Sequence, residues 1–261
     1  MTATVDSPRT EPRSQGPRFS LRALMIAMFL VSVLLSGLWY LAQSVNHAYR
    51  SALRTAAQGH LNQLAMALHN YHDIHGAFPP AYIPDETGQP MHSWRVLILP
   101  YIEQQALYAE YRFDEPWNSP HNLGLAERMP AVFRSPTEPL SRSNTNMVVI
   151  VGPGTAFPGA EPTKLTDFTD GTENCILLTE IARSDICWLE PRDLDTTTMS
   201  FRVNDRTRPS ISAAHWRSPY VVFADTIRGY LVPLDTPPDD LKALTTIAGG
   251  EPITRNQIWP P

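Results

Sequence analysis

The sequence predicts an α+β fold, in which a long amino-terminal transmembrane helix continues onto an antiparallel β-sheet. Three observations support this prediction. Residues 23–42 contain no charged side chain, and residues 53–71 place apolar side chains on one helical face. Short β-rich runs separated by turn residues follow between residues 147 and 232. A long helix combined with antiparallel hairpins belongs to the α+β class.

A membrane anchor is predicted by the run from Ala23 to Ala42. Twenty residues at about 1.5 Å each form a helix about 30 Å long, which matches the hydrocarbon core of a bilayer. The alternative is a cleaved secretory signal, whose apolar region is about 7 to 15 residues long and ends in a small-x-small site. The run here is longer and its end contains Trp39 and Tyr40, so a retained anchor is favoured.

Charge sets the expected orientation of this anchor. A short basic tail favours the cytoplasm, and the tail here contains Arg9, Arg13, Arg18 and Arg22. We therefore expect a single-pass protein of the cell inner membrane, with its amino terminus in the cytoplasm and its carboxy-terminal domain outside. The predicted parts are a disordered cytoplasmic tail (1–20), a transmembrane helix (21–42), an amphipathic extension of that helix (43–76) and an ectodomain (77–261).

The amphipathic extension is predicted by a regular spacing of apolar side chains. Steps of four, four, three, four and three residues join Leu53, Ala57, Leu61, Leu64, Leu68 and Tyr71. Such steps return to the same face of a helix. The helix is expected to end at Gly76, just before Pro79 and Pro80.

Shorter elements are expected beyond residue 80. Helices are predicted at 102–111 and 238–248, and a strand is predicted at 147–151. Two hairpins are predicted from β-rich runs on either side of turn residues. The first joins 175–181 to 186–189, and the second joins 220–224 to 228–232 through a turn near Asp225 and Thr226.

Composition argues against one class of partner. The chain has 21 basic and 26 acidic residues, and leaving out the four arginines and two acids of the tail gives 17 basic and 24 acidic ones. This remainder is acidic, whereas surfaces that bind nucleic acid are basic. A nucleic-acid partner is therefore not expected.

Several strings occur together in an order that resembles one protein family. They are Leu68–Asp73, Phe78–Pro80, Ser93–Tyr101 with Glu103 and Gln104, Asp170–Asn174, and His215 with Asp225. The family is a large group of pseudopilin-like proteins of unknown function from planctomycete-type bacteria, with a terminal His-x9-Asp-Gly signature. The resemblance implies a pilin-like ectodomain and a type II secretion or surface-assembly role, with no established reaction. It also makes His215 and Asp225 the signature residues of this chain.

Two departures from the family pattern bear on function. A prepilin start reads Gly-Phe-Thr-Leu-Val-Glu, whereas this chain has Arg18 at the glycine position and Ala23 at the glutamate position. A permanent anchor is therefore favoured over peptidase processing and filament assembly. The Asp-Gly turn reads Asp225-Thr226, and a β-branched residue is unfavourable at positive φ. The turn must therefore have another conformation or another length.

Three histidines near the end of the predicted helix are candidate metal ligands. His69 and His72 share a helical face and could bind a metal ion together with Asp73. His75 lies on the far side of the helix from them. No cysteine or second histidine pair accompanies them, so capping and packing of the helix end is the favoured interpretation. Neither a metal nor a cofactor is predicted.

His215 and Asp225 could form half of a catalytic site, because a carboxylate can orient a histidine as a general base. No Gly-x-Ser-x-Gly nucleophile motif accompanies them. The favoured interpretation is structural, with Asp225 holding the hairpin turn through its own side chain. No catalytic residue is predicted.

Two further groups of residues have both a chemical and a structural interpretation. Asp167, Asp170, Glu173 and Asn174 offer oxygen ligands for a cation such as calcium, but the EF-hand spacing is absent and Asp170 also suits a turn. In the first predicted hairpin Cys187 lies opposite Glu180, so its sulfur does not face that of Cys175. We expect two buried thiols without a disulfide.

Two functional classes are therefore considered. The favoured one is a non-enzymatic, membrane-anchored, pseudopilin-like protein with secretion-system or self-association partners. The alternative is an anchored hydrolase that uses His215 and Asp225, or a cation-dependent binding module that uses the Asp167 and Asp170 cluster. Convergence of these polar groups in an open cleft would favour the alternative.

Overall fold

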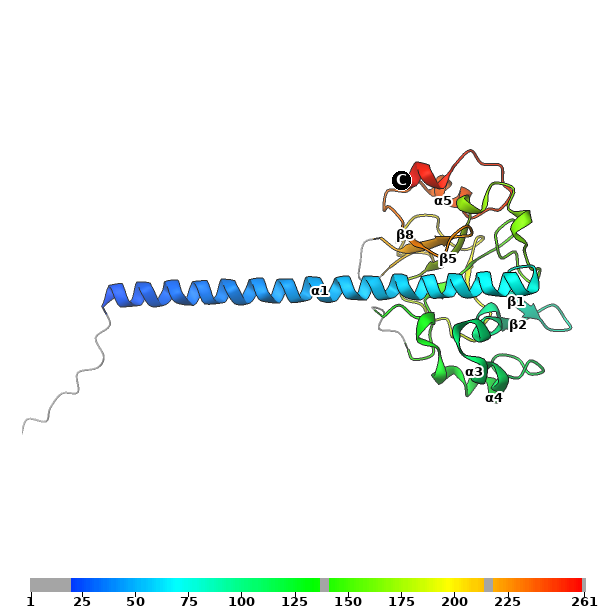
Figure 1. The fold of residues 1–261 in the computed structure, drawn as a ribbon, viewed down its shortest axis with the longest axis horizontal. Helices are drawn as coiled ribbons and strands as arrows, with labels where there is room; N and C mark the ends of the chain where they lie inside the picture. The colour runs from blue at the N-terminus through cyan, green and yellow to red at the C-terminus, as the bar shows by residue number, and fades with distance from the viewer. Residues whose placement is uncertain (1–19, 137–140, 214–217, 260–261) are drawn as a thin grey trace, which may run out of the picture. The chain divides into compact units, whose positions relative to one another are not determined.

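The computed structural model describes residues 20–136, 141–213 and 218–259 of the 261-residue chain. The chain forms two compact units, Met1–Ser51 and Ala52–Pro261. Helix α1 (Leu21–His75) belongs to both units, since it begins in the first and ends in the second (Figure 1). The predicted continuous helix is confirmed, and the fold class is α+β.

In the first unit, α1 exposes large apolar side chains around its whole circumference. Its large apolar side chains from Leu21 to Tyr49 are 52–73% exposed. The hydroxyls of Ser32 and Ser36 donate to backbone carbonyls one turn earlier, at 2.8 and 2.9 Å, so they need no partner outside the helix. Among the described residues, this is the one helix long and apolar enough to cross a membrane.

In the second unit, one face of α1 is buried. The buried side chains include Ala57, Leu61, Leu64 and Leu68 of the predicted stripe. The helix ends at His75, and Gly76 follows with a φ of 76° while its N–H donates to the carbonyl of His72 at 2.7 Å. This left-handed cap confirms the predicted end, because glycine adopts positive φ without steric cost.

A four-stranded antiparallel sheet forms the centre of the second unit, in the order β3-β5-β7-β8. Its strands are β3 (Met147–Val148), β5 (Ile176–Glu180), β7 (Tyr220–Phe223) and β8 (Gly229–Leu231). Strands β7 and β8 pair directly, which confirms the second predicted hairpin. The predicted run 147–151 divides into β3 and β4 (Ile150–Val151), and β4 pairs in parallel with β6 (Leu194–Asp195).

The first predicted hairpin is wrong. Strand β5 pairs with β3 and β7, and residues 186–189 form no strand, apart from an isolated bridge between Cys187 and Asn144. All five residues of β5 are buried. Strand β5 is central in the sheet, and both of its neighbouring strands come from distant parts of the chain. The chain then turns away at Arg183, which has a φ of 56°.

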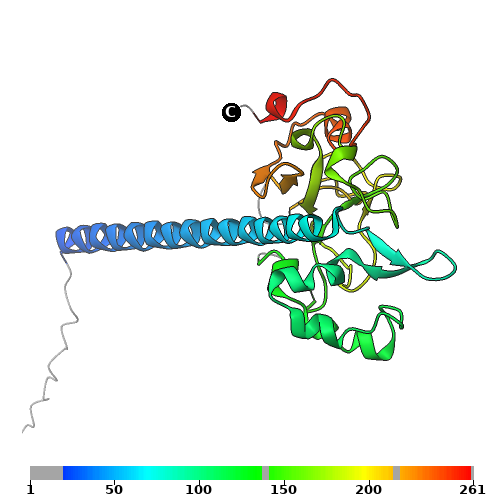
Figure 2. The same ribbon diagram turned by 45° about the vertical axis from the view of Figure 1, so that its right-hand side comes forward.

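Short helices and one hairpin complete the unit (Figure 2). The hairpin pairs β1 (Tyr82–Pro84) with β2 (Pro90–Ser93). The helices are α2 (Trp94–Leu97), η1 (Leu99–Ile102), α3 (Gln105–Glu110), α4 (Pro120–Leu123), η2 (Ala126–Arg128), η3 (Ala131–Phe133), η4 (Leu165–Asp167), η5 (Thr172–Asn174), α5 (Pro238–Ala243) and α6 (Arg255–Ile258).

Two predicted helices are shorter than expected. Only α3 forms within the range predicted as a helix at 102–111, because η1 ends at Ile102 and Glu103 follows with a left-handed φ of 61°. The helix predicted at 238–248 ends at Ala243. In both places the apolar pattern of the sequence predicts a longer helix than the backbone forms.

Two apolar clusters lie on the two faces of the sheet. Along β7, Val222 belongs to the cluster that includes the buried face of α1, whereas Val221 and Phe223 belong to the other cluster, which α5 covers with Leu241. This alternation follows from the two-residue period of a strand. Helix α1 is therefore the main cover of one face of the sheet.

Helix α1 also closes the edge of the sheet at β8. The amide of Gln58 donates to the carbonyl of Gly229 at 2.9 Å, and the N–H of Gly229 donates to Oδ1 of Asn62 at 3.0 Å. A Cβ at Gly229 would lie 3.4 Å from both Gln58 and Tyr220, which is ordinary van der Waals contact, so the helix packs closely against this strand. Exposed strand edges can pair with other chains, and these two side chains satisfy the backbone groups of Gly229 at that edge.

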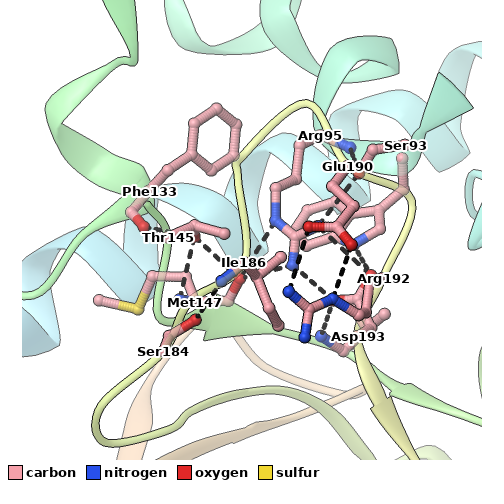
Figure 3. Close-up of polar contacts among 12 residues, drawn as sticks. Ser93, Arg95, Phe133, Thr145, Met147, Ser184, Ile186, Glu190, Arg192 and Asp193 are labelled. Atoms are coloured by element: carbon pink, nitrogen blue, oxygen red, sulfur yellow. Dashed lines mark hydrogen bonds and ion pairs between the residues drawn. The ribbon is translucent and has the colours of Figure 1, made fainter. Parts of the chain in front are cut away.

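A buried ion pair connects α2 to the sheet (Figure 3). The carboxylate of Asp193 accepts from Nη2 of Arg95 at 2.5 Å, from the indole of Trp94 at 3.1 Å and from the N–H of Val149 at 3.0 Å. Arg95 also donates to the carbonyl of Met147 at 3.0 Å. The two charged side chains are only 0% and 2% exposed. Burial raises the pKa of Asp193 to about 6, against the opposing effect of Arg95, so the carboxylate is ionised at neutral pH.

We expect Arg95→Met to destabilise the protein strongly, by about 3 to 5 kcal/mol, because it leaves the Asp193 carboxylate buried without a cation. The double variant Arg95→Met, Asp193→Leu should recover much of this loss, since neither charge is then buried alone. Urea unfolding of the full chain in detergent, followed by near-ultraviolet circular dichroism, measures both. Arg128→Met, at an exposed ion pair with Glu110, is the control and should change little. Equal losses in the single and double variants would contradict this account.

Candidate functional site

The signature residue Asp225 pairs with an arginine from the carboxy-terminal helix. It follows strand β7, and its Oδ1 accepts from Nη1 of Arg255 in α6 at 2.7 Å. The side chains of this pair are 26% and 17% exposed. The Arg255 guanidinium also lies over the rings of Phe223 and Tyr230, at 5.3 and 5.2 Å from their centroids. Asp225 therefore helps to hold the carboxy-terminal segment against the β7–β8 hairpin.

The turn around Asp225 is longer than a two-residue hairpin turn. Val222 pairs with Gly229, so residues 223–228 form the connection. The N–H of Thr226 donates to the carbonyl of Phe223 at 3.3 Å, and the N–H of Arg228 donates to the Thr226 hydroxyl at 3.1 Å. Thr226 does not have a positive φ. The prediction that Thr226 forces another turn length or conformation is confirmed.

His215, the other signature residue, lies outside the described residues. The segments that flank it, 211–213 and 218–220, lie at the start of β7, whereas Asp225 follows the end of that strand. The proposed pairing of His215 with Asp225 therefore stays a prediction. The described partner of Asp225 is Arg255.

His69 of α1 also lies near Asp225. Burial lowers the pKa of His69, while the charges of Asp73 and Asp225 act in the opposite direction and His72 adds to the lowering. Its Nε2 atom is buried and has no hydrogen-bond partner among the described residues. The ring packs edge-on against Phe78 at 5.5 Å. His69 is thus a neutral packing histidine at neutral pH.

The other two histidines of the row make separate contacts. His72 packs against Phe78 at 5.0 Å and its Nε2 accepts from the N–H of Leu165 at 3.5 Å. His75 stacks on Tyr71 at 4.1 Å, and its Nε2 lies 3.0 Å from the Tyr101 hydroxyl. Within the described part of the chain, no three His, Cys, Asp or Glu side chains gather closely enough to hold a metal ion.

The oxygen-rich group near Asp170 binds backbone N–H groups. Asp167 accepts from the N–H of Lys164 at 2.8 Å. Asp170 accepts from the N–H of Gly250 at 3.0 Å, and Asn174 accepts from the N–H of Arg255 at 2.9 Å. Glu173 is exposed on η5. Two of these four side chains therefore fasten the carboxy-terminal segment, and the arrangement resembles a set of backbone caps more than a cation site.

Both cysteines are free thiols, but the reasoning that predicted this was wrong. Cys175 is buried, and burial raises the pKa of its thiol far above the ordinary value. Cys187 is only partly buried, which corrects the prediction of two buried thiols. The predicted hairpin that would have separated the sulfurs does not form, since residues 186–189 are not a strand.

Two contacts in this region were not expected from the sequence. Arg255 was not singled out, although it joins Asp225, Asn174 and the aromatic rings of the hairpin. Asp193 was not singled out either, although it neutralises Arg95. Both pairs join residues far apart in the chain, and no local pattern marks them. An arginine inside the apolar string 93–101 was the one available signal, because a buried arginine requires an anion.

Comparison with known protein families gives one match. Residues 47–160, less than half of the chain, match a family described as "Protein of unknown function (DUF1559)". The match contains the strings Leu68–Asp73, Phe78–Pro80 and Ser93–Tyr101, but not those near Asp170 and Asp225. It supports the resemblance to a planctomycete-type family of unknown function. Comparison with curated proteins found no match, and comparison with solved structures found none.

The lowered pKa of His69 predicts a loss of stability in acid. Below the ordinary value of 6.5 the unfolded chain binds a proton more readily than the folded one, so the free energy of unfolding falls as the pH drops through this range. We expect His69→Gln to lose less stability between pH 7 and pH 5 than the original protein, as measured by urea unfolding at each pH. His92, whose pKa burial also lowers, and Asp193 are present in both proteins and cancel in the difference. Parallel stability curves would contradict this assignment.

A structural role for Asp225 predicts a loss of stability when its charge is removed. Asp225→Asn should lower the free energy of unfolding by about 1 to 2 kcal/mol, because it weakens a charge-assisted hydrogen bond to Arg255. Hydrogen exchange should become faster in residues 249–258, which this pair fastens. Asp185→Asn, at an exposed ion pair with Arg192, is the matched control and should change little. Unchanged stability together with a lost enzymatic activity would favour the catalytic alternative.

Proposed function

We propose that this protein is a non-enzymatic, membrane-anchored, pseudopilin-like component that presents its carboxy-terminal domain outside the cytoplasm in secretion or surface assembly. The observation that carries the proposal is the change in α1 near residue 52. Before it, apolar side chains are exposed around the whole helix, and after it one face is buried in a domain. One helix thus combines an apolar rod with the backbone of a folded unit.

The first part of α1 supports the anchor on energetic grounds. Apolar surface costs about 25 cal/mol for each Å² exposed to water, and a bilayer removes that cost over a helix of this length. Residues 23–49 contain no Asp, Glu, Lys or Arg. The expected single-pass placement in the cell inner membrane, with the basic tail in the cytoplasm, follows from the distribution of charge around this run.

The non-enzymatic part of the proposal is supported by how the polar candidates are used. Asp225 is paired with Arg255, and Asp170 and Asn174 bind backbone N–H groups of the carboxy-terminal segment. Groups engaged in this way are not free to act as a general base or to bind a cation. They stabilise the domain that α1 presents.

The role in secretion or assembly is supported by the resemblance to pseudopilin-like proteins and by the layout of α1. Arg18 and Ala23 stand at positions that processing and assembly use in a prepilin start. We therefore propose that the anchor is retained and that the domain acts through secretion-system proteins or through other copies of itself. No reaction is assigned to the domain.

Epitope accessibility tests the anchor and its orientation. In intact spheroplasts we expect a carboxy-terminal epitope on the full chain to bind antibody, and an amino-terminal epitope to do so only after permeabilisation. Leu30→Arg with Leu34→Arg should release the protein from carbonate-washed membranes, because two charges interrupt the apolar run. Met66→Arg, on the exposed side of α1 in the second unit, should leave it bound.

The same preparation tests the role. We expect mass spectrometry to find an uncut amino terminus. We also expect secretion proteins, or a differently tagged copy of the chain, to co-purify with it. A freely soluble full chain would contradict the anchor, and a chain cut near Phe19 would contradict the retained start.

A further inference from the structure

The exposed charges of the second unit are unevenly distributed along α1. The end that holds Ala52 and Arg54 is here named the proximal end, and the end that holds His75 is named the distal end. Strand β7 runs in the same direction as α1, because the side chain of Arg54 lies beside Tyr220 whereas that of His69 lies near Asp225. The start of β7 therefore marks the proximal end.

Three loops meet at the proximal end. Strand β5 is antiparallel to β7 and ends here at Glu180, and β3 begins here because Met147 pairs with Glu180. The loop before β3 is bonded to the loop after β5, since the N–H of Thr145 donates to the carbonyl of Ile186 at 2.8 Å. The loop after β5 is bonded in turn to residues 200–213, since the N–H of Ala182 donates to the hydroxyl of Ser212 at 2.9 Å.

Arg54 of α1 and four arginines on these loops form a group that we name the basic rim: Arg54, Arg142, Arg183, Arg202 and Arg206. The last four are exposed, and within the described residues none of the five is in an ion pair. Arg202 and Arg206 flank Asn204. The N–H of Asn204 donates to the carbonyl of Ile211 at 3.0 Å, which holds this turn beside residues 211–213.

Three acidic side chains of the described residues lie near the rim, and each has a partner outside it. Asp185 pairs with Arg192 at 3.0 Å, and Asp205 accepts from the N–H and hydroxyl of Thr207 at 2.8 and 2.7 Å. Glu180 is only 1% exposed and accepts from the N–H of Tyr220 at 3.0 Å. Among the described residues the five arginines of the rim outnumber these three carboxylates, so this end carries a net positive charge there.

The distal end has the opposite charge. Asp73 is 78% exposed there, and the segments bonded to the end of α1 carry further acids. For example, the N–H of Phe78 donates to the carbonyl of Thr163, which lies between Glu161 and Asp167. The one basic residue of that segment is Lys164. An acidic chain thus concentrates exposed arginines at the end that is covalently joined to the apolar part of α1.

We propose that the basic rim binds the phosphate-bearing headgroups of anionic phospholipids in the membrane that holds α1. The inference rests on the proposed anchor, because residues 50–54 join the rim directly to the apolar run. Guanidinium groups match phosphate oxygens in pairs, and each basic residue near an anionic surface strengthens the interaction about fivefold, the factor that corresponds to about 1 kcal/mol. The acidic remainder of the domain disfavours long polyanions such as nucleic acid.

Hydrogen exchange of the full chain in lipid nanodiscs tests the proposal. One set contains phosphatidylcholine alone, and the other contains about 30% phosphatidylglycerol as the anionic lipid. We expect slower exchange in residues 141–145, 182–186 and 200–206 in the anionic discs, and loss of this protection in about 0.5 M NaCl, where charges are screened within a few Å.

A charge-matched pair of variants makes the test specific. The rim variant carries Arg142→Gln, Arg183→Gln, Arg202→Gln and Arg206→Gln, and should lose the protection. The control has the same change in net charge through Gln89→Glu, Thr166→Glu, Thr169→Glu and Asn256→Glu, at exposed positions away from the rim. It should keep the protection. Urea unfolding checks that both variants remain folded.

The outcomes separate this inference from the anchor on which it rests. Flotation of the full chain with both kinds of vesicle, without protection by anionic lipid, would overturn the rim proposal and leave the anchor in place. Failure to float with either would contradict the anchor itself. Equal protection in the two variants would also overturn the rim proposal. So would protection by a single-stranded oligonucleotide without protection by phosphatidylglycerol, since the surface would then bind nucleic acid.

Discussion

The contact between α1 and the sheet is the interaction on which the second unit depends. Its apolar stripe from Ala57 to Leu68 covers one face, while Gln58 and Asn62 satisfy the open edge of β8 at Gly229. The same helix therefore supplies core and edge protection together. Without it, β8 would present unpaired backbone groups and one face of the sheet would be exposed to water.

The buried pair of Arg95 and Asp193 is a second constraint, and it depends on the first. A buried charge is tolerated only where several donors and acceptors converge on it. The cover that α1 gives to the first apolar cluster, which includes Trp94, keeps this centre away from water. The pair in turn fixes α2 and the residues after Leu189 against β3, through the carbonyl of Met147. The ion pair therefore positions these segments as well as stabilising them.

Most of the polar residues that could act in catalysis or bind a cation instead stabilise the fold. Asp170, Asn174 and Asp225 all fasten the carboxy-terminal segment, in which Arg255 is the common partner of two of them. Within the part of the chain that the structure describes, the exposed arginines at the proximal end form no ion pair. The described charges thus divide into those that stabilise the domain and those that face outward, and the proposed role relies on the second group.

The sequence by itself determined the continuous helix, its buried stripe, its end at Gly76 and the hairpin of β7 with β8, because each follows from a local period or a local turn. The partners of β5 and the engagement of Asp225 by Arg255 were decided only by the tertiary structure. Both join residues dozens of positions apart, and their free energy depends on burial and on converging donors. Neither property exists until the chain has packed.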